Sequence, residues 1–247
     1  MIGDLEARLR ALAPVERLRG IRAAASGRIV FTTSLGLEDQ ALTHLIVESG
    51  AEIEFATLDT GRLFPESYAL WRETEARYGL RIRALYPRHE ALEALVAAHG
   101  VDGFYQSVEA RKACCGVRKV EPLGRALAGA AGWVTGLRAD QSAARGEARL
   151  AEVNAQYGLV KFNPLIDWSR DRIADFVAAH GVPANPLHRS GFLSIGCAPC
   201  TRAVAPGEPE RAGRWWWEDE TKKECGLHVD PEGRLRRAGA SVDEVTA

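Results

Sequence analysis

The sequence predicts an α/β protein built on a mostly parallel, twisted sheet with helices on both faces. Two observations predict this class. In the first half of the chain, short runs rich in β-branched and aromatic residues alternate with segments of helical periodicity. Each helical segment follows a strand closely, as in right-handed β-α-β units. The 247 residues are enough for one sizeable domain with an appendage.

The expected elements can be placed by their patterns and end signals. Strands are expected within residues 27–34, 51–61, 80–87 and 131–137, and helices within 37–49, 64–79, 89–100 and 169–181. Gly50 should end the first of these helices, and Pro65 suits the first turn of the second. Ser169 is placed to cap the last one.

Beyond about Pro183 the pattern changes. Pro, Gly and Arg punctuate irregular segments, and the run Trp215–Trp217 has neither helical nor strand alternation. We expect residues 1–205 to form the α/β domain, which binds the nucleotide and carries the cysteine pairs. Residues 206–247 should form a C-terminal segment laid over it, with the tryptophans packing that segment onto the core.

The composition is that of an ordinary globular protein, with 46% hydrophobic residues, 26% charged residues and a mean hydropathy of -0.17. The net charge of -1 offers no general attraction to nucleic acid or anionic lipid. The charged N-terminus lacks the apolar core of a signal peptide, and no run is long enough to span a membrane. We therefore expect a cytoplasmic protein with reduced thiols, without a nucleic-acid or membrane partner.

Three loops follow predicted strands, at residues 33–40, 58–66 and 133–142. In a parallel sheet, ligands bind at the carboxyl ends of strands, where helix N-termini favour phosphate. Each loop alone is also compatible with a plain strand-to-helix turn, but adjacent loops of this kind favour a nucleotide cleft. The candidate substrate ligands in them are Ser34, Gly36, Asp59, Thr60 and Arg138.

Four of the five cysteines form two pairs. Cys197 and Cys200 have the C-x-x-C spacing that turns two thiols toward one centre. Cys114 and Cys115 are adjacent, and adjacent side chains point apart, so they suit the spread corners of an iron–sulfur cluster better than one zinc ion. A disulfide is a weaker reading in a cytoplasmic protein, and buried unligated cysteines are the remaining alternative.

Basic residues are dense around both pairs, where they could offset thiolate charge or hold an anionic substrate. They are Arg111, Lys112, Arg118 and Lys119 near the first pair, and Arg202, Arg211 and Arg214 after the second.

Taken together, these residues resemble the assimilatory adenylyl-sulfate (APS) reductases, the iron–sulfur branch of the PAPS/APS reductase family. The matching stretches span roughly residues 30 to 228 and are SLGLED, LDTGRLFPE, KACCGVRKVEPL, WVTGLRADQS, FNPLIDW, GFLSIGCAPCTRAV, RAGRWWWE and KECGLH. The resemblance implies an ATP-pyrophosphatase-like (adenine nucleotide alpha hydrolase) fold. It also implies a 4Fe–4S cluster on Cys114, Cys115, Cys197 and Cys200.

The implied reaction is the reduction of APS to sulfite and AMP in sulfate assimilation and cysteine biosynthesis, with thioredoxin or a similar dithiol as reductant. Cys225 is expected to attack the sulfur and become S-sulfonated, because Lys222, Lys223 and His228 favour its thiolate. His228 could orient the sulfate or tune the thiol. For the phosphosulfate the expected ligands are Arg211 and Arg214, then Arg138, with Arg118 or Lys119 bridging cluster and substrate.

Three alternatives remain at this point: a PAPS reductase, an iron–sulfur tRNA-thiolation enzyme of the ATP-pyrophosphatase type, and a non-catalytic zinc or redox module. The thiolation enzyme would need an SGGxDS-like loop, from which SLGLED departs. A homo-oligomer is possible, and residues after Asp230 lie beyond the motifs.

Overall fold

The computed structural model describes residues 2–142 and 145–219. Within them, six strands form one sheet in the order β3-β2-β1-β4-β6-β5. The strands are β1 (Ile29–Thr33), β2 (Glu54–Leu58), β3 (Arg83–Leu85), β4 (Gly132–Val134), β5 (Ala151–Asn154) and β6 (Leu159–Phe162). All neighbours pair in parallel except β5 and β6, which are antiparallel. The predicted class is therefore confirmed.

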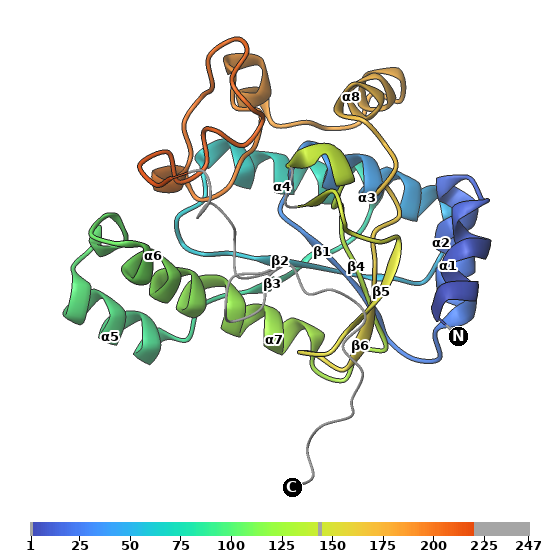
Figure 1. Ribbon diagram of the computed structural model, residues 1–247, viewed down its shortest axis with the longest axis horizontal. Coiled ribbons are helices and arrows are strands. Elements are labelled where there is room, and N and C mark those ends of the chain that lie inside the picture. The colour runs from blue at the N-terminus through green and yellow to red at the C-terminus, as the bar shows by residue number, and fades with distance from the viewer. Residues whose placement is uncertain (1, 143–144, 220–247) are drawn as a thin grey trace, which may run out of the picture.

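Helices cover both faces of the sheet (Figure 1). On one face lie α1 (Ile2–Arg10), α2 (Pro14–Ala24), α3 (Leu37–Ser49), α4 (Pro65–Tyr78) and α8 (Arg170–Ala179). On the other lie α5 (His89–His99), α6 (Val108–Cys115) and α7 (Glu121–Leu127). The larger core cluster packs β1 and β4 against α2, α3 and α8, and a smaller one packs Leu123 and Leu127 under the opposite face.

The predicted end signals are found where expected. Gly50 ends α3 in the left-handed conformation that glycine adopts without steric cost, and its N–H bonds Val47. Pro65 begins α4, where a missing N–H costs nothing. The Ser169 hydroxyl accepts a hydrogen bond from the Arg172 N–H and caps α8.

Three pairs of elements were not predicted: the helices α1 and α2, the short helices α6 and α7, and the hairpin of β5 and β6. The N-terminal helices α1 and α2 escape notice because charged residues dominate their sequence, yet Leu9, Leu18 and Ile21 are fully buried. The β5–β6 hairpin has strands of only four residues, too short for clear alternation.

After α8 the chain is irregular, as predicted. It forms the short 3₁₀ helices η5 (Pro186–Ser190) and η6 (Ala198–Cys200), and an isolated bridge joins Thr201 to Arg214. Residues 201–219 curve above α4 and α6 (Figure 1). The division into residues 1–205 and 206–247 stays a prediction, since only part of the second range is described. The described residues include no helix that is long and apolar enough to cross a membrane.

Candidate active site

The carboxyl ends of three neighbouring strands open into a cavity of about 170 Å³. The chain runs outward from β1 to β2 and β3, then returns to place β4 on the other side of β1. Strand order reverses at this point, which is where open α/β sheets bind ligands. Along the cavity wall, Thr33 ends β1 and Ser34 follows it, Thr57 and Thr60 belong to the β2 end, and Thr135 and Gly136 follow β4.

The loop after β1 is held by Asp39, in the first turn of α3. Its carboxylate accepts hydrogen bonds from the Ser34 N–H (2.6 Å) and the Ser34 hydroxyl (2.7 Å). Leu35 lies in the turn between Ser34 and α3. It has a left-handed φ of 61°, which is uncommon for a residue with a side chain of this size. Burying Leu35 against Leu70 and Ile82 stabilises this turn, which directs the N-terminus of α3 at the cavity.

Asp39 also approaches the backbone after β4. A Cβ at Gly136 would lie 2.3 Å from Asp39 Oδ1, so only glycine fits there. Burial raises the pKa of Asp39 to about 6, against hydrogen bonds from Ser34 and Gly136 that favour the carboxylate. One buried carboxyl group therefore fixes two of the three loops that form this wall.

Another part of the cavity wall, which we call the cysteine wall, comes from the segments that bear the cysteines. Lys119 and Cys197 line the same cavity as Ser34 and Thr60. The Thr60 hydroxyl lies 3.2 Å from Cys197 Sγ, and the Thr60 carbonyl accepts a 2.6 Å hydrogen bond from Arg118 Nη1. The loop after β2 thus joins the strand-end wall to the cysteines.

The cysteines lie on two short irregular segments. Cys114 and Cys115 end α6, directly before the π-helical turn η2 (Gly116–Val120) that carries Arg118 and Lys119. Cys197 directly precedes η6 and Cys200 is its last residue. Cys114, Cys197 and Cys200 pack together with Phe104 and Trp215, and Cys115 is buried beside Cys114 in the sequence. Cys114 of the first pair therefore meets the second pair, from which it is separated by about 80 residues in the sequence.

The thiols of this group repel one another as thiolates. Burial and the nearby Cys197 raise the pKa of Cys200 to about 12, while Lys119 and Arg214 oppose the rise. Burial likewise raises the pKa of Cys114 against the pull of Arg118. Within the described ranges no three His, Cys, Asp or Glu side chains come close enough to hold a single metal ion.

Arg211 and Arg214 approach the cysteine group from the C-terminal segment. Arg214 Nη1 donates to the Ile195 carbonyl at 3.3 Å, and its guanidinium lies against Gly196, where a Cβ would be 2.3 Å from Nη2. Both guanidinium groups stack on Trp215, Arg214 at 4.8 Å and Arg211 at 5.8 Å from the ring centroid. Neither residue lines the strand-end cavity.

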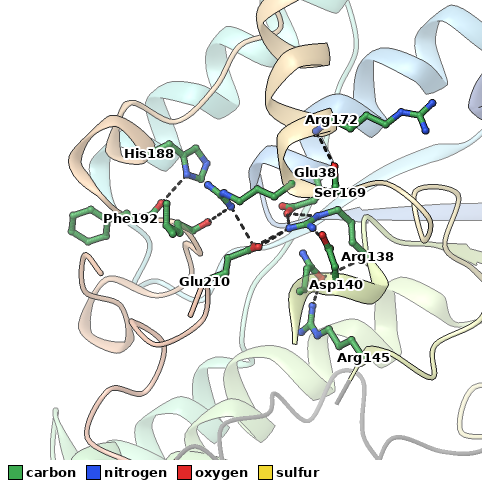
Figure 2. Close-up of polar contacts among 12 residues, drawn as sticks. Glu38, Arg138, Asp140, Arg145, Ser169, Arg172, His188, Phe192 and Glu210 are labelled. Atoms are coloured by element: carbon green, nitrogen blue, oxygen red, sulfur yellow. Dashed lines mark hydrogen bonds and ion pairs between the residues drawn. The ribbon is translucent and has the colours of Figure 1, made fainter. Parts of the chain in front are cut away.

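Arg138 is fully buried in an ionic network (Figure 2). Its Nε donates to Glu38 Oε1 at 2.9 Å, Nη1 contacts Asp140, and Nη2 reaches Glu210 Oε2 at 2.7 Å. Burial disfavours charge on Glu38, but the Arg138 guanidinium outweighs it and lowers the pKa of Glu38. Burial and the nearby Glu38 raise the pKa of Glu210. One cation is shared by several carboxylates.

Of the residues predicted from sequence, the cavity brings together Ser34, Thr60, Lys119 and Cys197. Gly36 precedes α3 beside Ser34, and Asp59 is buried, accepting hydrogen bonds from the Tyr68 hydroxyl and the Gly61 N–H. Cys225 and His228 lie outside the described residues.

Two residues of the cavity wall were missed by sequence reasoning. Asp39 belongs to the SLGLED stretch and lines the cavity, but an acidic residue in the first turn of a helix is common and gives no sign of such a role. Arg145 follows the third loop by three residues, and its Nη1 donates to Gln141 at 2.5 Å. A basic residue just past a strand-end loop was the available signal.

The fold and this cavity define a doubly wound α/β protein whose strand-end site is lined in part by a cysteine. Residues 28–203 match the family described as phosphoadenosine phosphosulfate reductase domain, and the chain belongs to that family. The "Adenosine 5'-phosphosulfate reductase" of Sinorhizobium fredii (strain USDA 257) is 58% identical, over 84% of this chain and 82% of that protein.

Two solved structures share the fold. The crystal structure of phosphoadenylyl-sulfate (PAPS) reductase from Candida auris, in a phosphate complex, has a TM-score of 0.70 and 26% identity, covering 82% of this chain and 96% of that one. The FMN adenylyltransferase of Candida glabrata, with FAD and pyrophosphate, has a TM-score of 0.50 and 16% identity, covering 92% and 80%. The second likeness concerns the fold alone.

Proposed function

We propose that this chain reduces adenosine 5'-phosphosulfate to sulfite and AMP, with thioredoxin or a similar dithiol as reductant. One observation carries the proposal: the strand-end cavity has Ser34 and the α3 N-terminus on one wall, and Lys119 and Cys197 on the other. The proposed nucleotide site would thus lie beside the cysteine group. The relative named adenosine 5'-phosphosulfate reductase, at 58% identity, supports the same substrate.

The described residues suggest how the substrate is held. Ser34 and the N–H groups at the start of α3 suit a phosphate, and Gly36 allows its close approach. Lys119 faces the cavity from the cysteine side and suits the sulfate end. We place Asp59, Thr60, Arg118 and Arg138 as supports of this site, because each is engaged in bonds to neighbouring loops. Arg211 and Arg214 are proposed to reach the phosphosulfate from the C-terminal segment.

The four cysteines fit a 4Fe–4S cluster. Three are buried, and they repel one another as thiolates, so they require positive charge that Arg118, Lys119 and Arg214 supply only in part. Arg214 Nε and Trp217 Nε1, close to this group, are buried donors with no acceptor among the described residues. When bound, the cluster would neutralise the thiolates and shape the electrostatic field beside the cavity. We propose Cys114, Cys115, Cys197 and Cys200 as its ligands.

The proposed chemistry is two successive displacements. The Cys225 thiolate attacks the sulfur of the phosphosulfate, an S–S bond forms, and the S–O bond breaks to release AMP. His228 would orient the sulfate or tune this thiol. A thiolate of the dithiol then attacks Cys225 Sγ, forming the thioredoxin–Cys225 mixed disulfide and expelling sulfite. The second thiol of the dithiol resolves this disulfide, so the dithiol loses two electrons and Cys225 returns to its thiolate.

Sulfite release from APS and from PAPS, measured with reduced thioredoxin under anaerobic conditions, tests the proposal. We expect a clear preference for APS. PAPS is the second candidate because the matched family and one solved neighbour are named for it. A strong PAPS preference would replace the proposed substrate, and absence of sulfite from both would reject the reductase activity.

A further inference from the structure

The segment from Glu210 to Glu218 is attached at both ends by buried ion pairs. Arg138 Nη2 donates to both carboxylate oxygens of Glu210, at 3.0 and 2.7 Å. Arg111 donates to Glu218 from Nε at 2.9 Å and from Nη2 at 2.7 Å. Both guanidinium groups are fully buried, and the Glu218 side chain is only 3% exposed. Such charge-assisted, two-point contacts fix orientation as well as distance.

The first pair connects the segment to the cavity. Figure 2 shows Glu210 reaching Arg138, which also bonds Glu38. Glu38 lies in the first turn of α3 and lines the cavity beside Ser34. Arg170, at the start of α8, contacts the same Glu210 carboxylate at 3.3 Å and donates to the Leu193 carbonyl. Glu210 thus ties the C-terminal segment to the phosphate-binding end of α3.

The second pair connects the segment to the cysteines. Arg111 lies on α6, the helix that ends in Cys114 and Cys115. Its guanidinium also stacks 4.9 Å from the ring centroid of Trp215, which packs on Cys197 and Cys200. The two ends of one short segment therefore contact two different functional parts of the molecule.

Between these ends the backbone of the segment contacts residues 197–202, which we call the cysteine turn. The Trp215 N–H donates to the Cys200 carbonyl at 3.1 Å, and the Arg202 N–H donates to the Gly213 carbonyl at 3.0 Å. Trp215 has a left-handed φ of 42°, which a tryptophan adopts only under constraint. The places of Arg211 and Arg214 follow from this constrained arch, residues 211–217.

We propose that Glu210 and Glu218 are positioning residues: two buried ion pairs hold the arch by its ends and so place Arg211 and Arg214 over the cysteine turn. Loss of Glu210 should affect substrate affinity, because Glu210 is linked to the cavity. Loss of Glu218 should affect iron retention, because Glu218 is linked to the cysteine-bearing helix. The kinetic and iron readouts of this inference rest on the proposed function and its cluster, whereas the proteolysis readout does not.

The test compares Glu210→Gln and Glu218→Gln with the matched control Glu208→Gln. Glu208 belongs to the same stretch and also pairs with an arginine, Arg202, but its side chain is 33% exposed. The amide keeps the shape of each side chain and removes its charge, so the buried guanidinium loses its ion pair with that residue. Glu210→Asp, which retains the charge on a shorter side chain, is the second variant and is used if Glu210→Gln fails to fold.

Limited proteolysis of the folded proteins is the first measurement, because it requires no substrate. We expect Glu210→Gln and Glu218→Gln to be cut within residues 205–219 roughly tenfold faster than wild type, since the arch loses one attachment. Glu208→Gln should match wild type, and Glu210→Asp should lie between. Equal cleavage in the three Gln variants would overturn the proposal.

Kinetics and iron content separate the two roles. Glu210→Gln should raise the KM for APS by roughly tenfold or more with kcat changed much less, because the arginines are displaced from the substrate. Its iron content should equal that of wild type. Glu218→Gln should instead lose iron severalfold faster in the presence of a chelator. If wild type released no sulfite from APS, the proposed function would fail, while proteolysis, which needs neither substrate nor cluster, would still decide the positioning roles.

Discussion

The two walls of the cavity are built in different ways. The strand-end wall consists of loops that directly follow β1, β2 and β4, fixed by hydroxyl groups, backbone N–H groups and the buried carboxyl groups of Asp39 and Asp59. The cysteine wall carries Lys119 of the turn η2 and Cys197 beside the 3₁₀ helix η6. The arch 211–217 does not line the cavity but packs against the cysteines through stacked guanidinium groups and a buried ion pair. The first wall is built mainly from loops that directly follow strands, and the second depends on contacts between distant segments.

This difference suggests a division of labour. A wall of fixed N–H groups at a helix N-terminus suits an unchanging anion such as a nucleotide phosphate. A wall of buried thiols and surrounding cations suits a group whose charge changes during reaction. Substitutions should accordingly separate chemistry, cysteine-site integrity and nucleotide affinity.

The largest effect is expected from Cys225→Ser. Serine cannot form the S-sulfonated intermediate, so sulfite release should fall below detection. The iron content and the brown colour should remain, because the proposed ligands are the other four cysteines. Loss of colour would instead make Cys225 a ligand and contradict the assignment.

A different failure is expected from Cys200→Ser. Cys200 packs with Cys114 and Cys197, so removal of its thiol should break the proposed cluster site. Iron per chain should fall by about tenfold or more, since even outer-shell changes cost 10- to 100-fold in metal affinity. Iron and sulfide analysis measures this, with Cys225→Ser as the chemically matched control. Full iron retention would exclude Cys200 as a ligand.

The strand-end wall is tested by Asp39→Asn. The carboxylate accepts from the N–H and the hydroxyl of Ser34 and from the Gly136 N–H, whereas the amide has one accepting oxygen with two lone pairs, so it cannot serve all three donors and the loop should shift. We expect kcat/KM for APS to fall by roughly 10²-fold and iron content to stay unchanged. Gly136→Ala should reproduce the defect by steric clash with Asp39. The control is Asp175→Asn on the exposed side of α8. If Asp39→Asn lowered kcat/KM no more than this control does, the role assigned to Asp39 would be contradicted.

The smallest predicted effect concerns pH and stability. The pKa of Asp39 is about 6 in the folded chain, above its ordinary value of 3.8. The folded state therefore holds this proton more tightly, and its contribution to stability is complete below about pH 4 and lost as pH rises through 6. Relative to Asp39→Asn, the wild-type free energy of unfolding should fall by about 3 kcal/mol at most across this window. Urea denaturation at several pH values measures it, and parallel curves for the two proteins would contradict the assignment.

The two walls also differ in how far the sequence predicts them. Strand and helix periodicity placed Ser34 and Thr60 on neighbouring strand ends, because short-range patterns determine β-α-β units. The spacing of Cys197 and Cys200, together with the adjacent cysteines, predicted that the pairs converge. Sequence patterns could not predict that Arg138 is surrounded by Glu38 and Glu210, since pairing across 100 and 72 residues depends on tertiary structure. The helices α1 and α2 were missed for a different reason: their apolar positions are too few to give a clear helical pattern.

The central claim is that one thiol of this chain takes the sulfonate group from the nucleotide. Its most direct test is anaerobic incubation of the intact protein with APS labelled in its sulfur, without reductant, followed by peptide mapping. We predict one labelled peptide, containing Cys225, with an equal amount of AMP released, and we predict that reduced thioredoxin then frees the label as sulfite. Label on Cys114, Cys115, Cys197 or Cys200, or AMP release with no labelled peptide, would contradict the account.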